Sequence, residues 1–252
     1  MSVGIRGRSL GQGRPWLCAP LVGRERERIL QEAAALSGLP VDIGEWRYDL
    51  AAPLEGGPES LLPAILEALG DRPLIFTYRT PAEKQGGGLA PLDYAAAILA
   101  AARAGADLVD IEWNRGQKLA AQLGRGAREA GCKTVFSCHD FLGTPSVALM
   151  VQTLLRMEDG GGDVVKLAVT PQTPEDVLAL LTATQEAGQR LSVPLITMSM
   201  GRLGMASRLC GGLFGSCLTF GAAAGESAPG QPPVEELART LGSVSYTHLT
   251  LP

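Results

Sequence analysis

The residue types that perform amine and imidazole chemistry are scarce in this chain. Two of the 252 residues are histidines, His139 and His248, and the lysines are Lys84, Lys118, Lys133 and Lys166. Among the lysines, Lys166 alone lies within an apolar run, where burial would favour the neutral amine that attacks a carbonyl carbon. The alternative is a lysine whose ammonium group reaches the rim of the fold. We therefore expect carbonyl chemistry at Lys166.

His139 is the candidate general acid or base. It ends an apolar run and directly follows Cys138. Because neighbouring residues of a strand point to opposite faces, the two side chains cannot meet, which excludes a Cys/His nucleophile pair. A hydrogen-bonded core histidine is the alternative to a catalytic one. His248 lies in the last part of the chain, where we expect no chemistry.

Charged residues mark the ends of other apolar runs. Glu45 and Arg47 share one face of their run, Asp110 and Glu112 share one face of another, and Arg79 ends a third. Charges within apolar strands are costly unless they are paired or functional. The pattern predicts polar groups that gather at one end of a sheet, either as a buried ion-pair network or as a functional site.

The elements that would position these groups alternate along the chain. The runs that predict strands are 16–21, 41–47, 73–78, 107–112, 134–139, 163–169, 194–198 and 216–220. The helical patterns are 24–37, 58–69, 91–104, 117–130, 145–158, 174–188, 202–209 and 233–241. Strands that alternate with helices of about 10–15 residues indicate parallel βαβ units. Eight such units predict an α/β fold of the (β/α)8 TIM-barrel type, whose active site lies at the carboxyl ends of the strands. An open doubly wound sheet is the alternative, but the first turn lacks a GxGxxG fingerprint.

We expect a single catalytic domain over residues 1–241. The segment 242–252 changes abruptly to a polar and β-prone composition, so we expect a non-native or disordered tail that forms neither helix nor strand. The last helix would then end near Leu241 and leave apolar surface uncovered beside the first and last strands of the barrel.

The composition excludes several classes of protein. Lysine and arginine total 22 against 26 acidic residues, and the net charge of −4 argues against a nucleic-acid partner. No apolar run approaches the roughly 20 residues of a membrane span, and the start has no signal-peptide pattern. Five cysteines without a CxxC pair indicate reduced thiols in a cytoplasmic protein, and two histidines argue against a zinc site.

Several motifs are together specific for one protein family, although each motif alone is weak evidence. They are Glu45-Trp-Arg-Tyr-Asp49, Phe76-Thr-Tyr-Arg-Thr80, Ser137-Cys-His-Asp-Phe141 with Thr144-Pro145, Asp163-Val-Val-Lys-Leu-Ala-Val-Thr-Pro171, Met200-Gly201, Ser207-Arg208, Phe214-Gly-Ser-Cys-Leu-Thr-Phe-Gly221 and Ser227-Ala-Pro-Gly-Gln231. In this order and spacing, from about Val3 to Leu241, the chain resembles type I 3-dehydroquinate dehydratase.

The resemblance implies a barrel that dehydrates 3-dehydroquinate to 3-dehydroshikimate in the shikimate pathway of aromatic amino acid biosynthesis. It implies no metal or other cofactor, and it suggests a homodimer. Lys166 would form a Schiff base with the substrate ketone, His139 would move the protons, and Glu83 would hold His139. The substrate-binding residues it implies are Glu45, Arg47, Arg79, Arg208, Ser227 and Gln231.

The chain departs from the family pattern after Glu83. In the family, two glycines usually follow the glutamate directly. Here Lys84 and Gln85 stand between Glu83 and the two glycines, so either Glu83 or Gln85 occupies the position of the family's glutamate. Pro20 stands where some members have a substrate-contacting serine. Glycines at 86–88 predict a mobile cover over residues 80–89.

Two alternatives to this function remain open. One is another Schiff-base barrel, such as a sugar-phosphate aldolase, which would need a phosphate site such as the segment 201–208. The other is a truncated and inactive barrel.

Overall fold

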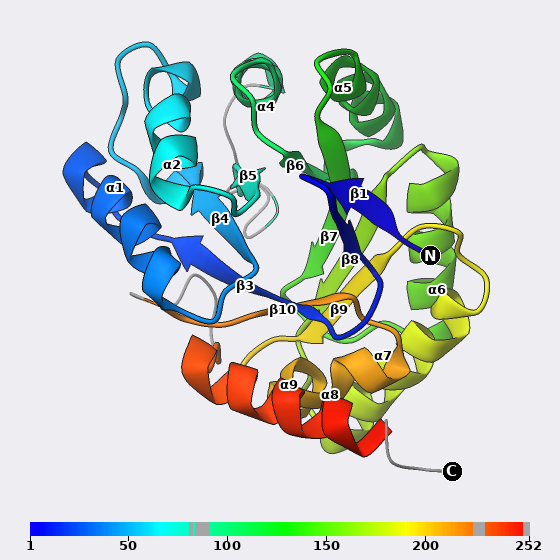
Figure 1. Ribbon diagram of the computed structural model, residues 1–252. Helices are drawn as coiled ribbons and strands as arrows, with labels where there is room; N and C mark the ends of the chain where they lie inside the picture. Colours follow the sequence, from blue (N-terminus) through cyan, green and yellow to red (C-terminus); the bar gives the residue numbers. More distant parts are fainter. Residues whose placement is uncertain (81–82, 84–90, 224–229, 249–252) are drawn as a thin grey trace.

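Eight parallel strands form a closed barrel in the computed structural model, which describes residues 1–80, 83, 91–223 and 230–248 (Figure 1). The order in the sheet is β10-β3-β4-β5-β6-β7-β8-β9. The strands are β3 (Trp16–Leu21), β4 (Ile43–Arg47), β5 (Leu74–Thr77), β6 (Leu108–Glu112), β7 (Lys133–Asp140), β8 (Val164–Val169), β9 (Leu195–Ser199) and β10 (Leu218–Phe220). The Cys217 amide donates to the Leu195 carbonyl at 2.8 Å and joins the two edge strands. The predicted (β/α)8 barrel is therefore confirmed.

Helices surround the barrel (Figure 1). They are α1 (Arg26–Ala35), α2 (Leu62–Leu69), α4 (Pro91–Arg103), α5 (Gln117–Glu129), α6 (Val147–Asp159), α7 (Pro174–Gly188), α8 (Met205–Cys210) and α9 (Val234–His248). Short 3-10 helices are η1 (Leu36–Gly38), η2 (Tyr48–Leu50), η3 (Pro58–Ser60), η4 (Trp113–Arg115) and η5 (Gly211–Phe214). Local sequence sets the start of α7, because Thr173 and Asp176 form a capping box there and Pro174 occupies the first turn. No helix in the described ranges is both long and apolar enough to cross a membrane.

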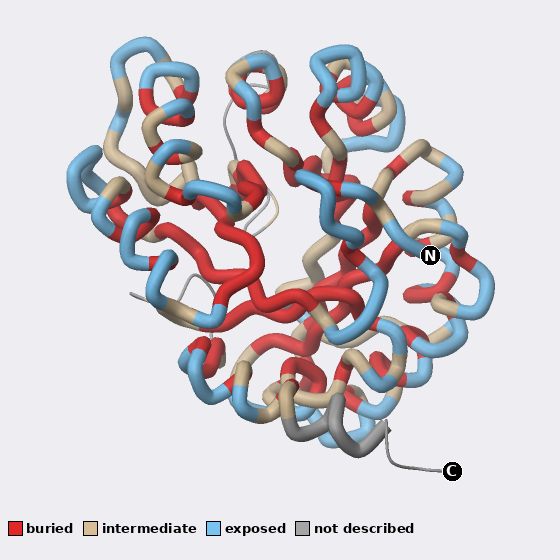
Figure 2. The backbone as a smooth tube through the Cα atoms, viewed as in Figure 1, coloured by how far each residue is buried: buried red, intermediate tan, exposed pale blue. Residues whose placement is uncertain are grey.

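Alternation along the strands divides the apolar side chains into two cores. On β6, Val109 and Ile111 belong to the core between barrel and helices, whereas Leu108 belongs to the core inside the barrel. Figure 2 shows the strands as a continuous buried centre. Since residues two apart share a face, Asp110 and Glu112 must point inward above Leu108. The alternation of side chains along the strand therefore places the charged residues at the mouth of the barrel.

An N-terminal hairpin covers the opposite end of the barrel. Strands β1 (Val3–Ile5) and β2 (Arg8–Leu10) pair antiparallel, and Ile5 and Leu10 pack into the interior core. Both Arg8 and Arg14 pair with Asp42 at 2.6 Å, just before β4 begins. The hairpin was not predicted, because strands of three residues show too little periodicity to stand out. It leaves the carboxyl ends of the strands as the open end.

Helix α9 continues beyond the point where the sequence predicted its end. It buries Val234, Leu237 and Leu241 and runs to His248, so the expectation that residues 242–248 form no helix is wrong. Polar residues do not stop a helix by themselves, and no proline precedes Pro252 in this segment. The predicted uncovered surface is also absent from the described strands, since Leu17 on β3 and Thr219 on β10, which face the surrounding helices, are buried. Residues 249–252 lie outside the described residues.

Candidate active site

A cavity lies at the carboxyl ends of the barrel strands, where the sequence predicted the site. It is lined by Glu45, Arg47, Thr77, Arg79, His139, Lys166, Ala168, Met198, Met200, Arg208, Phe220 and Gln231. Seven residues that the sequence singled out therefore meet in one place, although they come from segments spread over most of the chain. Ser227 and most of the segment 80–89, with the alternative residue Gln85, lie outside the described residues.

Lys166 lies on β8 and points into the barrel. It is 5% exposed, and its Nζ atom lies 3.2 Å from Asp110 Oδ2 and 3.8 Å from Glu45 Oε1. The Phe220 ring centroid is 4.7 Å from the same nitrogen. The alternative of an ammonium group at the rim is therefore wrong, because the amine is enclosed by two carboxylates and an aromatic face. A carbonyl compound that enters the cavity meets this nitrogen.

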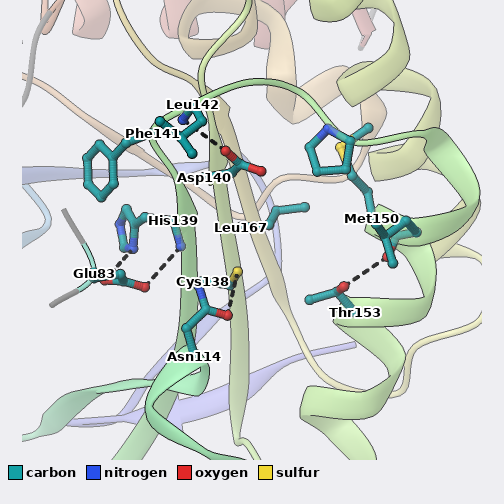
Figure 3. Close-up of a pocket in the computed structure, with 12 residues that line it drawn as sticks. Glu83, Asn114, Cys138, His139, Asp140, Phe141, Leu142, Met150, Thr153 and Leu167 are labelled. Carbon is teal, nitrogen blue, oxygen red and sulfur yellow. Dashed lines mark hydrogen bonds and ion pairs between the residues drawn. The ribbon is translucent and has the colours of Figure 1, made fainter. Parts of the chain in front are cut away.

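His139 is held by Glu83 at the end of β7 (Figure 3). Its Nδ1 atom lies 3.2 Å from Glu83 Oε2, and its backbone amide donates to Glu83 Oε1 at 3.0 Å. The Phe141 ring stacks nearby, with a centroid distance of 5.8 Å. Burial and the charges of Arg79 and Lys166 lower the pKa of His139 well below its ordinary value. The imidazole is therefore neutral near pH 7 and able to accept a proton.

Arg79 links Glu83 to the carboxylates of β6. Its Nη1 atom donates to Glu83 Oε2 at 2.6 Å and to Glu112 Oε1 at 3.2 Å, and its Nη2 atom donates to Asp110 Oδ1 at 2.9 Å. Although burial opposes its charge, the carboxylates of Asp110, Glu83 and Glu112 raise the pKa of Arg79. The guanidinium group is thus a permanent cation at the centre of three carboxyl groups.

Glu45 and Arg47 occupy the same side of β4, as their spacing predicted. Thr77 donates its hydroxyl to Glu45 Oε1 at 2.9 Å. Arg47 forms a two-point ion pair with Asp49, with Nε to Oδ1 at 2.8 Å and Nη2 to Oδ2 at 2.7 Å. A guanidinium group in a planar, bidentate ion pair has a fixed orientation. Both residues therefore present charge to the cavity in defined positions.

Arg208 and Gln231 close the other side of the cavity. Both are buried, at 2% and 5% exposure, and Arg208 Nη1 lies 3.8 Å from Met198 Sδ. Gly230 has a φ of +76°, and a Cβ built there would lie 2.6 Å from the Gly201 carbonyl carbon. Only glycine allows this approach, which brings Gln231 against the segment that leads to Arg208. The two side chains can bind a carboxylate or hydroxyl groups.

Asp110 and Glu112 belong to the site, although sequence reasoning gave them no role of their own. Despite burial, Arg79 and Lys166 hold the pKa of Asp110 well below its usual range, so this carboxylate is ionised. Burial and the nearby Glu83 carboxylate together raise the pKa of Glu112 to about 7, although the Arg79 charge opposes the rise. Their i and i+2 spacing was the available signal, but it could not name their partners.

Cys138 does not line the catalytic cavity, and its side chain points away from the His139 ring, as strand alternation predicted (Figure 3). Its sulfur donates to Asn114 Oδ1 at 3.3 Å, and it borders a second cavity between β7 and α6. Burial raises the pKa of Cys138 to about 11, so the group is a thiol near neutral pH. The exclusion of a Cys/His nucleophile pair is therefore confirmed.

The described residues contain no group of three or more histidine, cysteine, aspartate and glutamate side chains arranged to hold a metal ion. Near Lys166, the carboxylates are instead paired with Arg79 and with the lysine itself. The chemistry that this arrangement offers is that of an amine, an imidazole and carboxylates.

The fold and the site define an enzyme of the (β/α)8-barrel class with a buried lysine at its mouth. Residues 17–247 match the family model described as type I 3-dehydroquinase. The 3-dehydroquinate dehydratase of Geobacillus sp. (strain WCH70) is 39% identical over 247 residues, covering 95% of this chain and 93% of that protein. The one from Enterococcus faecalis is 42% identical over 238 residues, covering 92% and 93%. A crystal structure of type I 3-dehydroquinate dehydratase from Clostridium difficile superposes with a TM-score of 0.93 at 36% identity, covering 98% of this chain and 99% of that one. The chain belongs to the type I 3-dehydroquinase family.

Proposed function

We propose that this chain dehydrates 3-dehydroquinate to 3-dehydroshikimate in the shikimate pathway, through a Schiff base on Lys166. The observation that carries the proposal is the enclosure of Lys166 Nζ in the same cavity as His139, which Glu83 holds at 3.2 Å. A buried amine beside a neutral imidazole is the arrangement that imine chemistry with proton transfer requires.

Imine formation begins when Lys166 attacks the substrate ketone. Lys166, which donates to Asp110, passes one proton to His139, and its nitrogen bonds to the carbonyl carbon as the carbonyl π electrons move to oxygen. The oxygen then takes that proton from His139, which gives a carbinolamine. His139 accepts and returns protons so that the carbinolamine hydroxyl leaves as water. The resulting iminium withdraws electrons from the adjacent carbon and acidifies its C–H bond.

Elimination then requires one base and one acid, and His139 can be both. The neutral imidazole removes the proton next to the iminium, and the bond electrons form an enamine. The enamine expels the β-hydroxyl group, which takes the proton from the imidazolium and leaves as water. One water molecule then hydrolyses the product iminium and frees Lys166. Glu83, 3.2 Å from Nδ1, stabilises the imidazolium between these steps.

The polar groups of the substrate would be held around this centre. Arg208 is suited to the carboxylate, because a planar guanidinium can donate two parallel hydrogen bonds. Gln231 and Ser227 would bind hydroxyl groups, and Glu45, Arg47 and Arg79 would bind the polar groups on the other side. Arg79 also donates to Glu83, so it would serve the histidine as well as the substrate.

A relative supports the covalent step. The Clostridium difficile enzyme was crystallised with covalently modified comenic acid, and its structure superposes on this chain over nearly its full length. A covalently modified ligand in a relative this similar is consistent with a covalent step, and borohydride trapping tests whether Lys166 performs it.

A sugar-phosphate aldolase would need a phosphate site near α8. In that segment Ser207 donates its hydroxyl to the Gly204 carbonyl at 2.7 Å and accepts from the Ser199 amide at 2.8 Å. Its hydroxyl is thus engaged with backbone, which favours dehydration over the aldolase reaction. An inactive barrel is the other alternative, and activity assays decide both.

The deciding experiment is borohydride reduction in the presence of 3-dehydroquinate, followed by peptide mass mapping. We expect a reduced adduct on the peptide that contains Lys166 and, without borohydride, accumulation of the conjugated enone product. A retro-aldol product instead would favour the aldolase, and a folded protein with no adduct would favour the inactive barrel.

We also propose a homodimer, as the family resemblance suggests, in the cytoplasm, as the cysteine pattern indicates. Light scattering during size-exclusion chromatography gives the mass directly. A mass equal to one chain would contradict the dimer.

A further inference from the structure

Glu112 is a buried carboxylate that does not line the catalytic cavity, yet it contacts the residues that hold the catalytic pair. We propose that Glu112 is a positioning residue that sets the geometry and charge of the Glu83–His139 pair through Arg79 and Thr80. The inference rests on the proposed function for its kinetic test, but its geometry is independent of the substrate.

The first connection runs through one nitrogen of Arg79. Nη1 donates to Glu83 Oε2 at 2.6 Å and to Glu112 Oε1 at 3.2 Å, so the two carboxylates share a single donor. Asp110 fixes the other terminal nitrogen at 2.9 Å. Because the guanidinium is planar and held on both sides, a change at Glu112 alters the donor that Glu83 receives.

The second connection runs through the backbone of Thr80. Thr80 donates its amide to Glu112 Oε1 at 2.8 Å and its hydroxyl to Glu112 Oε2 at 2.6 Å. The Glu83 amide in turn donates to the Thr80 carbonyl at 3.2 Å. Glu112 therefore anchors Thr80, whose carbonyl accepts from the amide of Glu83, the residue that reaches His139.

Several charged or titratable groups surround Glu112. Arg79 and Glu83 come from the segment after β5, Asp110 from β6 itself and His139 from β7. Tyr94 on α4 accepts from the Glu112 amide at 2.8 Å, and Arg115 on η4 donates to the Thr80 hydroxyl at 3.1 Å.

This setting gives Glu112 a second property besides its contacts. Burial and the Glu83 charge raise the pKa of Glu112 to about 7, although the Arg79 charge opposes this rise. The carboxyl group is therefore neutral below this pH and ionised above it. Once ionised, it adds negative charge near the catalytic pair and stabilises the imidazolium that forms when His139 takes the substrate proton.

The test compares Glu112→Gln with a matched substitution at another buried carboxylate. Glu32 is also buried and accepts from the Val22 and Gly23 amides at 2.8 and 2.9 Å, but it lies outside the cavity. Glu112→Gln keeps the size and loses the charge, so it resembles the wild type only while Glu112 is protonated. We expect equal kcat values at about pH 6 and a roughly three- to tenfold lower kcat for Glu112→Gln at about pH 8.5, equivalent to half to one pKa unit at the histidine.

For Glu32→Gln, the ratio of its kcat to the wild-type kcat should not change with pH. A ratio that is equally constant for Glu112→Gln would overturn the proposal. Thermal melts of both variants show whether the compared proteins are folded.

A second measurement needs no substrate. In His248→Gln, His139 is the sole histidine, so its ring 15N signals are assigned without ambiguity. We expect these signals to shift with an inflection near pH 7, where Glu112 titrates, and we expect Glu112→Gln to lack that inflection. A flat titration curve in the His248→Gln protein contradicts the proposal, whether or not 3-dehydroquinate is the substrate.

Discussion

The Nζ atom of Lys166 lies 3.2 Å from Oδ2 of Asp110, although 56 residues and strand β7 separate them. The other oxygen of Asp110 accepts from Arg79 at 2.9 Å and from the Ser137 hydroxyl at 2.5 Å. One carboxylate thus joins the lysine proposed to form the imine to the arginine that holds Glu83. The amine and the imidazole are fixed relative to each other by this network rather than by direct contact.

Substitution of the buried lysine tests the covalent step. Lys166→Ala should abolish borohydride trapping and turnover, because no other lysine contacts the cavity among the described residues. Lys133→Ala is the matched control, since this lysine pairs with Asp163 at 3.8 Å on the surface. The measurement is the mass of the reduced protein. A trapped adduct on Lys84, Lys118 or Lys133 would sink the assignment.

Loss of the imidazole should separate binding from proton transfer. We expect His139→Ala to lower kcat by about 10²–10⁴-fold, the usual contribution of a general acid or base, while an adduct is still trapped. His248→Ala should leave kcat unchanged. Single-turnover trapping and steady-state rates measure the two effects. Near-wild-type turnover of His139→Ala would remove this residue from the mechanism.

The barrel could be predicted because the apolar runs and helical patterns that indicate it are local features of the sequence. Each of the eight strands coincides with a predicted apolar run to within about two residues, and the alternation on β6 gave the shared face of Asp110 and Glu112. Their partners were not predictable, since the contact between Asp110 and Lys166 arises from barrel closure across an intervening strand.

Other misses have separate physical causes. The hairpin of β1 and β2 is too short for periodicity to reveal it, and its stability comes from the packing of Ile5 and Leu10 under the barrel. The end of α9 was placed too early because composition alone does not stop a helix. Of the two candidates for the family glutamate, Glu83 lies against His139, whereas Gln85 lies outside the described residues.

Removal of the Asp110 charge should destabilise the fold. Asp110→Asn leaves the buried side chains of Arg79 and Lys166 without the anion that they share, and breaking such a buried pair typically costs about 3–5 kcal/mol. For a chain of this size, we expect a fall in Tm of roughly 6–20 °C. Asp71→Asn, at an exposed position, should change Tm by less than about 2 °C. If Asp110→Asn and the wild type have the same Tm, the network contributes little to stability.

Arg208 should act on substrate affinity more than on chemistry. Lysine cannot donate the two parallel hydrogen bonds of a guanidinium, so we expect Arg208→Lys to raise KM by about tenfold or more, with a smaller change in kcat. The exposed Arg202 on the same segment supplies the control Arg202→Lys. Steady-state kinetics measure both constants. An unchanged KM would show that the substrate carboxylate binds elsewhere.

The last prediction concerns the end of α9. The described residues that anchor this helix are Val234, Leu237 and Leu241, which are 0%, 0% and 5% exposed. A chain that ends at Leu241 keeps all three. Residues outside such anchors usually change stability by no more than about 0.5 kcal/mol. We therefore expect removal of residues 242–252 to shift Tm by about 1–2 °C at most. The matched control is Leu237→Ala, which removes a buried anchor and should cost about 2–5 kcal/mol. Thermal melts of the three proteins decide the matter. If the shortened chain melts several degrees below the full chain, the tail is a structural element of this barrel, and the expectation of a non-native or disordered tail is wrong for the whole segment.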